Sequence, residues 1–276
     1  MVNSFLIGVI SFGLILAIIQ DIKRKEIDNW LNLLIFISGT IYILIESIIT
    51  KEYFILFYFL MTFIGIFLFA NILYYSNIFA GGDYHLLLAL TPLFVTTQFN
   101  LIFSNIFLFL ILLIFSGSFY GLFFSIFLYF KNFRRIKEET KKELRKNKIK
   151  FFLITSIITI PLIFISSLLI LIPILLILTP FLFSIAKVLQ EKVLTKKISV
   201  KNLKVGDWLA EDIEINKELI KSDFKGISLK ELRLIQKKKK FIIIKEGIPF
   251  APAFIIAFIL YLIFRSQLIT YFLFLF

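Results

Sequence analysis

Hydrophobic positions in this chain fall in long blocks that short polar segments separate. The blocks cover residues 3–20, 30–49, 53–78, 84–98, 101–130, 151–188 and 249–275. About 20 apolar residues suffice for a helix to cross a bilayer, so each block predicts at least one transmembrane helix. The block over 151–188 is too long for one crossing and contains three prolines, so it predicts a helical hairpin that turns near residue 170. The pattern therefore predicts about eight transmembrane helices.

The polar segments differ in charge, and this difference predicts an orientation. Segments 131–150 and 189–247 are rich in lysine and arginine, and 21–29 contains three basic residues in a row. The connection 96–100 has no charged residue. Basic loops remain on the cytoplasmic side of a membrane. We therefore expect an N-terminus outside the cell membrane and all basic loops in the cytoplasm.

These observations predict an all-α polytopic membrane protein with a small α+β cytoplasmic insertion. In the insertion, Gly206-Asp207 favours a turn, Ser228 and Glu231 have the spacing of a helix capping box, and Phe241–Lys245 is typical of a strand. The expected parts are a membrane domain of five helices over 1–130, a basic cytoplasmic loop over 131–150, a transmembrane hairpin over 151–188, a small soluble cytoplasmic domain over 189–247 and a C-terminal transmembrane helix over 248–276.

Composition narrows the class of function. The chain has 276 residues, of which 59% are hydrophobic, a formal net charge of +13, no cysteine and a single histidine, His85. Disulfides and cysteine-ligated zinc are excluded, and one histidine argues against a histidine-based metal site. The positive charge flanks membrane helices, which favours contact with anionic lipid headgroups over binding to nucleic acid. We read His85 as a histidine at the membrane interface.

Two aspartates stand at the edges of apolar blocks. Asp21 ends the first block, and Asp83 precedes the fourth. The charge scheme places both at the cytoplasmic face. A carboxylate at the bilayer centre costs about 2.5–3.5 kcal/mol on insertion scales, so such residues are functional candidates. Two convergent carboxylates can share one proton, as in aspartyl proteases.

Structural alternatives exist for each of these acids. Asp21 could form an interfacial ion pair with Arg24 or Lys25, and such pairs contribute little stability. Asp83 could satisfy the N–H groups at the start of its helix, and Asp28 has the same simple explanation as a helix cap.

The order of these motifs resembles a known family. Asp21 follows the first helix, the polar run 23–30 opens the second, and Gly81-Gly82-Asp83 opens the fourth. This arrangement is similar to the archaeal type IV prepilin and preflagellin peptidases, which are aspartyl membrane proteases of the GxGD type. Segments 245–254 and 203–212 resemble the start of a late helix and the soluble part of the larger members. One departure is Ala80, which stands where the family pattern has its first glycine, and a cost is expected if this position needs a positive φ.

The resemblance implies a catalytic pair, Asp21 and Asp83, supported by the loop glycines Gly81 and Gly82. One ionised carboxylate would activate water while the protonated one polarises the scissile carbonyl, with no metal and no cofactor. The glycines would let a substrate approach closely. The implied substrates are pilin-like or archaellin precursors, cut at the cytoplasmic face between a short basic leader and an apolar helix.

Two further implications concern the leader and a second activity. Basic leader residues would favour nearby carboxylates, for which Glu26 and Asp28 are candidates, although both could equally be solvated loop acids. Bacterial relatives with a cysteine-rich domain also methylate the product. The absence of cysteine here predicts peptidase activity without methylation.

Two other classes of function remain compatible with the same residues. An ion- or proton-coupled transporter could use membrane-edge aspartates, although such carboxylates usually lie near the middle of the bilayer. A non-catalytic membrane protein of pilus assembly would not depend on them. Replacing either aspartate with asparagine distinguishes these classes from a protease.

Overall fold

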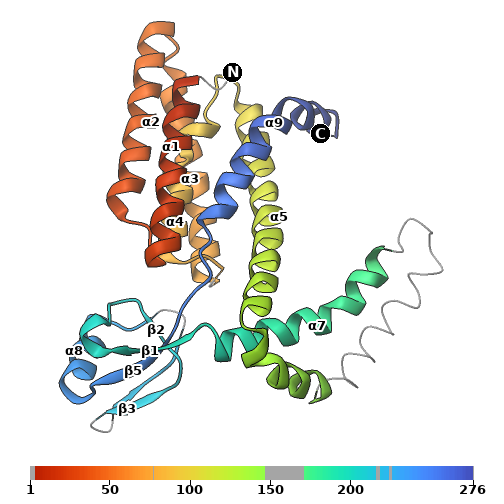
Figure 1. Cartoon of the computed structure of the whole chain (residues 1–276). Helices are drawn as coiled ribbons and strands as arrows, with labels where there is room; N and C mark the ends of the chain where they lie inside the picture. The colour runs from red at the N-terminus through yellow and green to blue at the C-terminus, as the bar shows by residue number, and fades with distance from the viewer. Residues whose placement is uncertain (1–3, 77, 147–170, 216–217, 224–225, 276) are drawn as a thin grey trace. The chain divides into compact units, whose positions relative to one another are not determined.

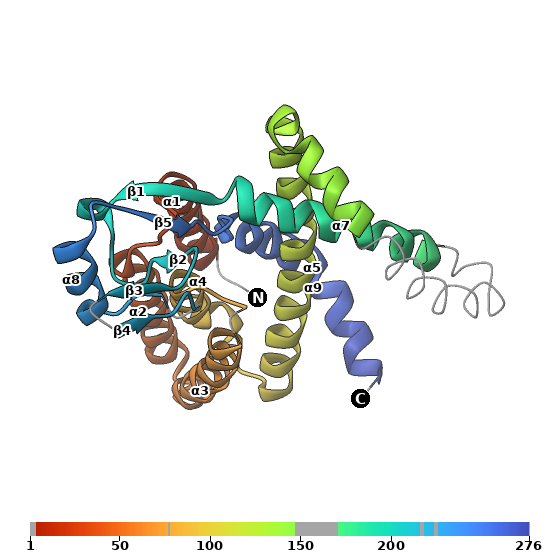
Figure 2. The same cartoon turned by 90° about the horizontal axis from the view of Figure 1, so that it is seen from below.

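The computed structural model of the chain describes residues 4–76, 78–146, 171–215, 218–223 and 226–275. The chain divides into two compact units, one formed by Met1–Gly121 with Ile248–Phe276 and the other by Leu122–Gly247. Helices predominate, and the described strands all belong to the second unit. Figure 1 colours the elements along the chain, and Figure 2 turns the same cartoon by 90°.

Six helical elements and the first part of a seventh helix contribute to the first unit. They are α1 Ser4–Arg24, α2 Asn29–Thr50, α3 Phe54–Tyr75, α4 Gly81–Ala89, the 3₁₀ helix η1 Thr91–Phe94, α5 Phe99–Lys131, which continues into the second unit, and α9 Ala251–Leu275. The first helix packs against α2 and α9, while α4 packs against α2 and α3. Both views show α1 to α4 as one bundle, with α9 beside α5 (Figures 1 and 2).

The bundle has the apolar surface that a bilayer requires. Four described helices are long and apolar enough to cross a membrane, at Ser4–Arg24, Asn29–Thr50, Phe54–Tyr75 and Leu101–Lys131, and a shorter apolar helix covers Ala251–Arg265. In α1, Leu6, Ile10 and Leu14 are buried, whereas Phe12 and Ile19 are exposed. Because every exposed position in α1 before its last turn is also compatible with lipid, the protein is a membrane protein with one helix face packed and the other facing hydrocarbon.

The helix bundle has two ends, which carry different polar residues. Successive helices α1, α2 and α3 alternate in direction, so the last turn of α1 and the first turn of α2 lie at one end. We call this end, which carries Asp21, the Asp21 end. The turn between α2 and α3 lies at the other end, which we call the Lys51 end. The 22 residues of α2 separate the two ends by about 33 Å.

The expected span over 84–98 is not one continuous helix. The helix α4 ends at Ala89 after nine residues, a length of about 14 Å, and a 3₁₀ turn with Pro92 follows. Proline removes a main-chain donor and disfavours helical geometry at the residue before it, which explains the break near Thr91. Hydropathy alone could not detect it, because the residues on both sides of the break are apolar and buried.

The expected hairpin over 151–188 is described only in its second half. Residues 151–170 lie outside the described part of the chain. The helix α7 Leu171–Lys192 follows and runs without interruption past Pro173 and Pro180. The predicted total of about eight crossings therefore stays a prediction.

Close helix contacts in the first unit depend on two glycines. A Cβ atom on Gly13 would lie 2.5 Å from the Ile35 side chain, and one on Gly39 would lie 2.6 Å from Pro92. The first glycine brings α1 onto α2, and the second brings α2 onto η1. Small residues allow such close approach between helices in a membrane.

The second unit contains the small sheet region. Its described elements are α7, β1 Thr195–Ser199, the 3₁₀ helix η3 Val200–Asn202, β2 Trp208–Leu209, β3 Ile213–Ile215, β4 Glu218–Ile220, α8 Leu229–Lys238 and β5 Phe241–Lys245. The antiparallel sheet has the order β1-β5-β2, and β3 pairs with β4 as a hairpin. The predicted strand over Phe241–Lys245 is confirmed, and so is the capping box, since the Ser228 hydroxyl accepts from the Glu231 N–H.

The basic segment that we expected to be a loop is largely helical. Residues 133–146 form a helix in the second unit. Ile136 is fully buried in a small apolar cluster with Ile185, Val188 and Leu189 of α7, and Glu143 pairs with Lys187 at 2.5 Å. Lysine, arginine and glutamate have high helix propensities, so an apolar anchor is enough to make such a charged segment helical.

The Gly39 contact yields a test of this packing. Gly39→Ala places a methyl group against the rigid Pro92 ring, which costs about 1–3 kcal/mol, while alanine regains at most about 1 kcal/mol of helix propensity. We expect a lower midpoint of thermal unfolding in detergent. Gly65→Ala in α3 is the matched control, because no described atom lies within 4 Å of its added Cβ. Equal midpoints for the two variants would show that the contact is looser than described.

Candidate active site

The first candidate residue, Asp21, lies in the last turn of α1 and is buried. Only 6% of its surface is exposed, although Ile22, Lys23 and Arg24 beside it are exposed. The helix ends just beyond it, because Lys25 adopts a left-handed conformation with φ of 59°. Asp21 therefore points into the bundle at the level where the chain leaves it.

The carboxylate of Asp21 is bound by the start of α9. The main-chain N–H of Ala251 donates to its Oδ2 atom at 2.9 Å, and the N–H of Phe250 adds a second main-chain hydrogen bond. The first N–H groups of a helix have no partner within the helix and carry the positive end of its dipole. The charge of Asp21 therefore has a specific partner. Of the two ion-pair partners considered for Asp21, Arg24 pairs with Asp28 at 2.6 Å, whereas the charge of Lys25 does act on Asp21.

The second candidate, Asp83, lies in the first turn of α4 and is 8% exposed. Ala80 is the N-cap residue of this helix, and Gly81 and Gly82 are its first two helical residues. The Asp83 carboxylate accepts from the Ala80 N–H at 3.3 Å. Asp83 is therefore not the N-cap itself, although it satisfies one N–H group at the helix start, as the structural alternative supposed.

Gly82 allows the loop between α1 and α2 to reach α4. A Cβ atom on Gly82 would lie 3.4 Å from both the main-chain nitrogen and the Cβ atom of Ile27, whereas no described atom lies within 4 Å of one on Gly81. The close approach that we expected of the glycines is thus made by the protein's own chain. Ile27 follows Asp21 by only six residues and Asp83 is the residue after Gly82, so this contact brings the two acids near each other.

Ala80, the departure from the glycine pattern, fits its position without strain. Its φ is −76° and its ψ is 166°, which is ordinary extended backbone. The positive φ that would have made alanine costly is absent at this residue.

The two acids interact electrostatically. The charge of Asp21 acts directly on the Asp83 carboxyl, and both groups are buried. Two carboxylates in such surroundings cannot both ionise at low cost, so the pair favours a shared state with one proton. Among the described residues, no group of three or more His, Cys, Asp or Glu side chains could hold a metal ion. The site thus places two buried carboxyl groups within electrostatic reach of each other.

The weaker candidates lie on the surface of the same loop. Glu26 is exposed, and Asp28 is half-buried. Asp28 occupies the N-cap position of α2 but makes no side-chain cap. Its carboxylate instead accepts from Arg24 at 2.6 Å and from the Trp30 indole N–H at 3.0 Å. Asp28 is thus the cap residue that we expected at the start of α2, although its side chain pairs with Arg24 and Trp30 in place of the helix N–H groups.

A wall on α5, which sequence reasoning missed, completes the surroundings of Asp21. A Cβ atom on Gly117 would lie 2.6 Å from the Phe250 ring, so α5 touches the residue that precedes Ala251. Tyr120, one turn later, lies within the electrostatic reach of Asp21. The hydroxyl of Ser116 is buried and has no hydrogen-bond partner among the described residues. The signal in the sequence that could have indicated this wall is the presence of hydroxyl residues, Ser116 and Tyr120, in a helix rich in phenylalanine.

Two other features stand apart from this site. His85 is exposed and makes an edge-on contact with Tyr84, which agrees with a position at the interface.

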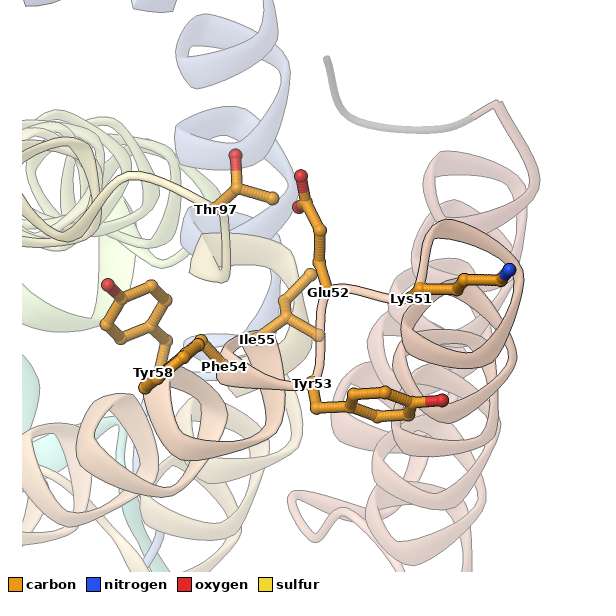
Figure 3. A pocket seen from close by; sticks show the side chains of 7 residues that line it. All are labelled: Lys51, Glu52, Tyr53, Phe54, Ile55, Tyr58 and Thr97. Atoms are coloured by element: carbon orange, nitrogen blue, oxygen red, sulfur yellow. The ribbon is translucent and has the colours of Figure 1, made fainter.

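A hollow of about 550 Å³ opens at the Lys51 end and is lined by Lys51, Glu52, Tyr53, Phe54, Ile55, Tyr58 and Thr97 (Figure 3). Glu52 is the one carboxylate in that lining, so the hollow has no acid pair.

Comparison with known proteins gives one match. Residues 8–130 match the family described as the type IV leader peptidase family. The matched segment includes Asp21, Asp83, Ser116 and Tyr120, and it ends before α9. None of the curated proteins and none of the solved structures matches the chain.

The contact between Gly82 and Ile27 can be tested with a matched pair of variants. Gly82→Val adds two methyl groups beyond a Cβ atom that would already touch Ile27, and we expect this overpacking to cost about 1–3 kcal/mol. Gly81→Val adds the same side chain at the neighbouring helix position, where space is open. We expect a lower midpoint of thermal unfolding for Gly82→Val than for Gly81→Val. The reverse order would mean that Ile27 does not pack on α4.

Proposed function

Residues 8–130 belong to the type IV leader peptidase family, and from this premise we propose that the protein is a membrane aspartyl endopeptidase that removes the short basic leader of type IV pilin-like or archaellin precursors. The observation that supports the aspartyl chemistry is the pair of buried carboxylates, Asp21 and Asp83, which come from separate helices and interact electrostatically. The pair needs no cofactor for peptide hydrolysis.

The two acids have different hydrogen-bond environments, which suggests a role for each. Main-chain N–H groups at the start of α9 stabilise the ionised form of Asp21. Asp83 has one longer bond, to Ala80, and lies beside the Asp21 charge. In our proposal Asp21 is the ionised base that takes a proton from water, and Asp83 donates its proton to the scissile carbonyl oxygen. The resulting hydroxide attacks the carbonyl carbon to form a gem-diol. As the C–N bond then breaks, the proton held by Asp21 passes to the leaving amine and one hydroxyl proton of the diol returns to Asp83.

The polar loops support a site at the cytoplasmic face. Lys23, Arg24 and Lys25 follow Asp21 after one intervening residue, at the Asp21 end of the bundle. Positive residues at the end of a first helix favour the cytoplasmic side. A precursor with a basic leader and an apolar helix would place its junction at that depth, beside the two acids. Glu26 and Asp28 lie on the same loop and are candidates for contact with basic leader residues.

The proposed activity is peptide hydrolysis alone. The 276 residues include no cysteine, whereas the resemblance assigns methylation to relatives with a cysteine-rich domain. We therefore propose a peptidase that leaves the new N-terminus unmodified.

The test of the proposed function is cleavage of a precursor by variants of each acid. Asp21→Asn and Asp83→Asn each remove one partner of the proton-sharing pair, so we expect the cleavage rate to fall by at least about 10³-fold for either change. Co-expression with pilin-like and archaellin precursors, followed by N-terminal sequencing of the product, measures this loss. Glu52→Gln, an exposed acid at the Lys51 end, is the control that should cleave at the normal rate.

Three results would contradict the proposal. The first is cleavage by either asparagine variant at the wild-type rate. The second is loss of cleavage with a metal chelator. The third is an uncut precursor in the presence of folded wild-type protein, in which case flux of ions or protons across vesicles becomes the property to measure in the same variants.

A further inference from the structure

The surface of α5 that faces the bundle is unusual for its hydroxyl groups. In the last two turns of α5 before the second unit, Leu113, Ser116 and Gly117 are buried and Tyr120 is half-buried. The positions between them, Ile114, Phe115, Ser118 and Phe119, are exposed. The inward face of this apolar helix therefore carries one serine and one tyrosine, one helical turn apart.

This face lies at the candidate active site. Gly117 touches the Phe250 ring, and the next residue, Ala251, donates its N–H to Asp21 at 2.9 Å. Tyr120 lies within the electrostatic reach of Asp21. Ser116 and Tyr120 flank Gly117 on the same side of the helix, so both are placed next to the start of α9 and the first catalytic acid.

The Ser116 hydroxyl is held at an energetic cost. Its residue is 3% exposed, and its Oγ atom has no hydrogen-bond partner among the described residues. Serine in a membrane helix can donate to the carbonyl one turn earlier, as Ser118 does to Ile114 at 2.8 Å. Ser116 does not make such a bond in the described chain. A buried polar atom without a partner loses stability, which is expected where a ligand supplies the partner.

The substrate of the proposed reaction also has polar groups that need hydrogen-bond partners. A peptide must be extended to be cut, and the N–H and C=O groups of an extended chain are no longer paired within a helix. In surroundings of apolar helices, each unpaired group costs several kcal/mol. A hydroxyl group can both donate and accept, so it can pair with either kind of main-chain group.

The spacing of the two hydroxyl residues suits an extended chain. Positions four apart on a helix are separated by about 6 Å along its axis. Main-chain groups two residues apart in an extended chain are about 6.6–6.8 Å apart and point to the same side. The attachment points of Ser116 and Tyr120 on α5 are therefore spaced like alternate residues of one peptide strand that runs along this helix.

We propose that Ser116 and Tyr120 bind the main chain of the precursor where it is unwound at the junction between leader and helix, and so position the scissile bond against the acid pair. This inference rests on the proposed peptidase function. Both are positioning residues, because they hold the substrate and do not exchange the catalytic proton. They confer no preference for particular side chains, which suits an enzyme whose precursors share a junction geometry.

The experiment uses the full-length protein in detergent or nanodiscs with a synthetic precursor peptide. Ser116→Ala and Tyr120→Phe each remove one hydrogen bond, so we expect kcat/KM to fall by about 3- to 10-fold for each variant. The loss should appear in KM, with kcat within twofold of wild type and an unchanged pH profile. The matched controls are Ser118→Ala, whose hydroxyl faces outward, and Tyr53→Phe at the Lys51 end.

Thermal unfolding separates a substrate contact from a structural role. Because the Ser116 hydroxyl has no described partner, Ser116→Ala should unfold at the same temperature as wild type or higher. A variant that raises KM without loss of stability has lost a contact with the substrate. A lower unfolding midpoint that accounts for the loss of activity would overturn the inference for Ser116.

Substrates with one amide replaced by an ester identify the main-chain group directly. An ester lacks the N–H donor, so one substitution near the junction should raise KM for wild type but add nothing to the effect of Ser116→Ala. A second position, two residues away, should behave in the same way with Tyr120→Phe. Additive losses at every ester position would overturn the proposal.

The outcomes distinguish this inference from the proposed function. If wild type cuts the precursor and both variants cut it with wild-type KM and kcat, the α5 contact is wrong while the peptidase stands. If Tyr120→Phe lowers kcat and shifts the pH profile with KM unchanged, Tyr120 takes part in proton transfer and the positioning role is wrong. If wild type leaves every precursor intact, the proposed function fails, and the α5 contact fails with it.

Discussion

One hydrogen bond joins the first helix of this protein to its last. The Ala251 N–H donates to Asp21 across 230 residues of sequence, in a buried position. A buried carboxylate costs several kcal/mol unless hydrogen bonds or charges compensate it, and main-chain N–H groups at a helix start provide both. The start of α9 therefore offsets part of the cost of placing Asp21 at the edge of an apolar bundle. The same contact fixes where α9 begins relative to α1.

Around this bond, the site is built from close contacts that small residues permit. Gly82 admits Ile27 and so brings α4 to the end of α1, while Gly117 admits Phe250 and so brings α5 to the start of α9. Each contact places one wall of the site. At Gly117 there is no room for a side chain, whereas a Cβ atom at Gly82 would just touch Ile27, and neither glycine needs an unusual backbone conformation.

Much of the fold could be predicted from the sequence, because lipid imposes a simple demand on side chains. Long apolar blocks predicted α1, α2, α3 and α5, and the capping spacing of Ser228 and Glu231 predicted α8. The break at Pro92 was missed because hydropathy reports on apolar surroundings and not on the continuity of main-chain hydrogen bonds. The helix over 133–146 was missed because its charge indicates a side of the membrane and not a secondary structure, and its buried anchor is the single residue Ile136.

The candidate site was partly accessible for the same physical reason. Asp21 and Asp83 stand out because charge is costly beside hydrocarbon, and any reading of the sequence must explain them. The partner of Asp21 could not be found this way, because a main-chain N–H is common to almost every residue and has no signature. Tyr120 was missed because a single hydroxyl among many aromatic rings looks like membrane packing. The local pairs made by Asp28 depend on the turn that places Arg24 and Trp30 beside it.

The first unit is discontinuous in the chain, since Ile248–Phe276 joins Met1–Gly121 after the whole of the second unit. A ribosome that adds about 5–20 residues per second makes Ala251 roughly 10–45 seconds after Asp21, which precedes it by 230 residues. From the synthesis of Asp83 onward both aspartates are present, but the donor that anchors Asp21 has not yet been made. In the nascent chain Asp21 therefore lacks its hydrogen-bond donor. The order of synthesis delays assembly of the candidate site until α9 enters the membrane.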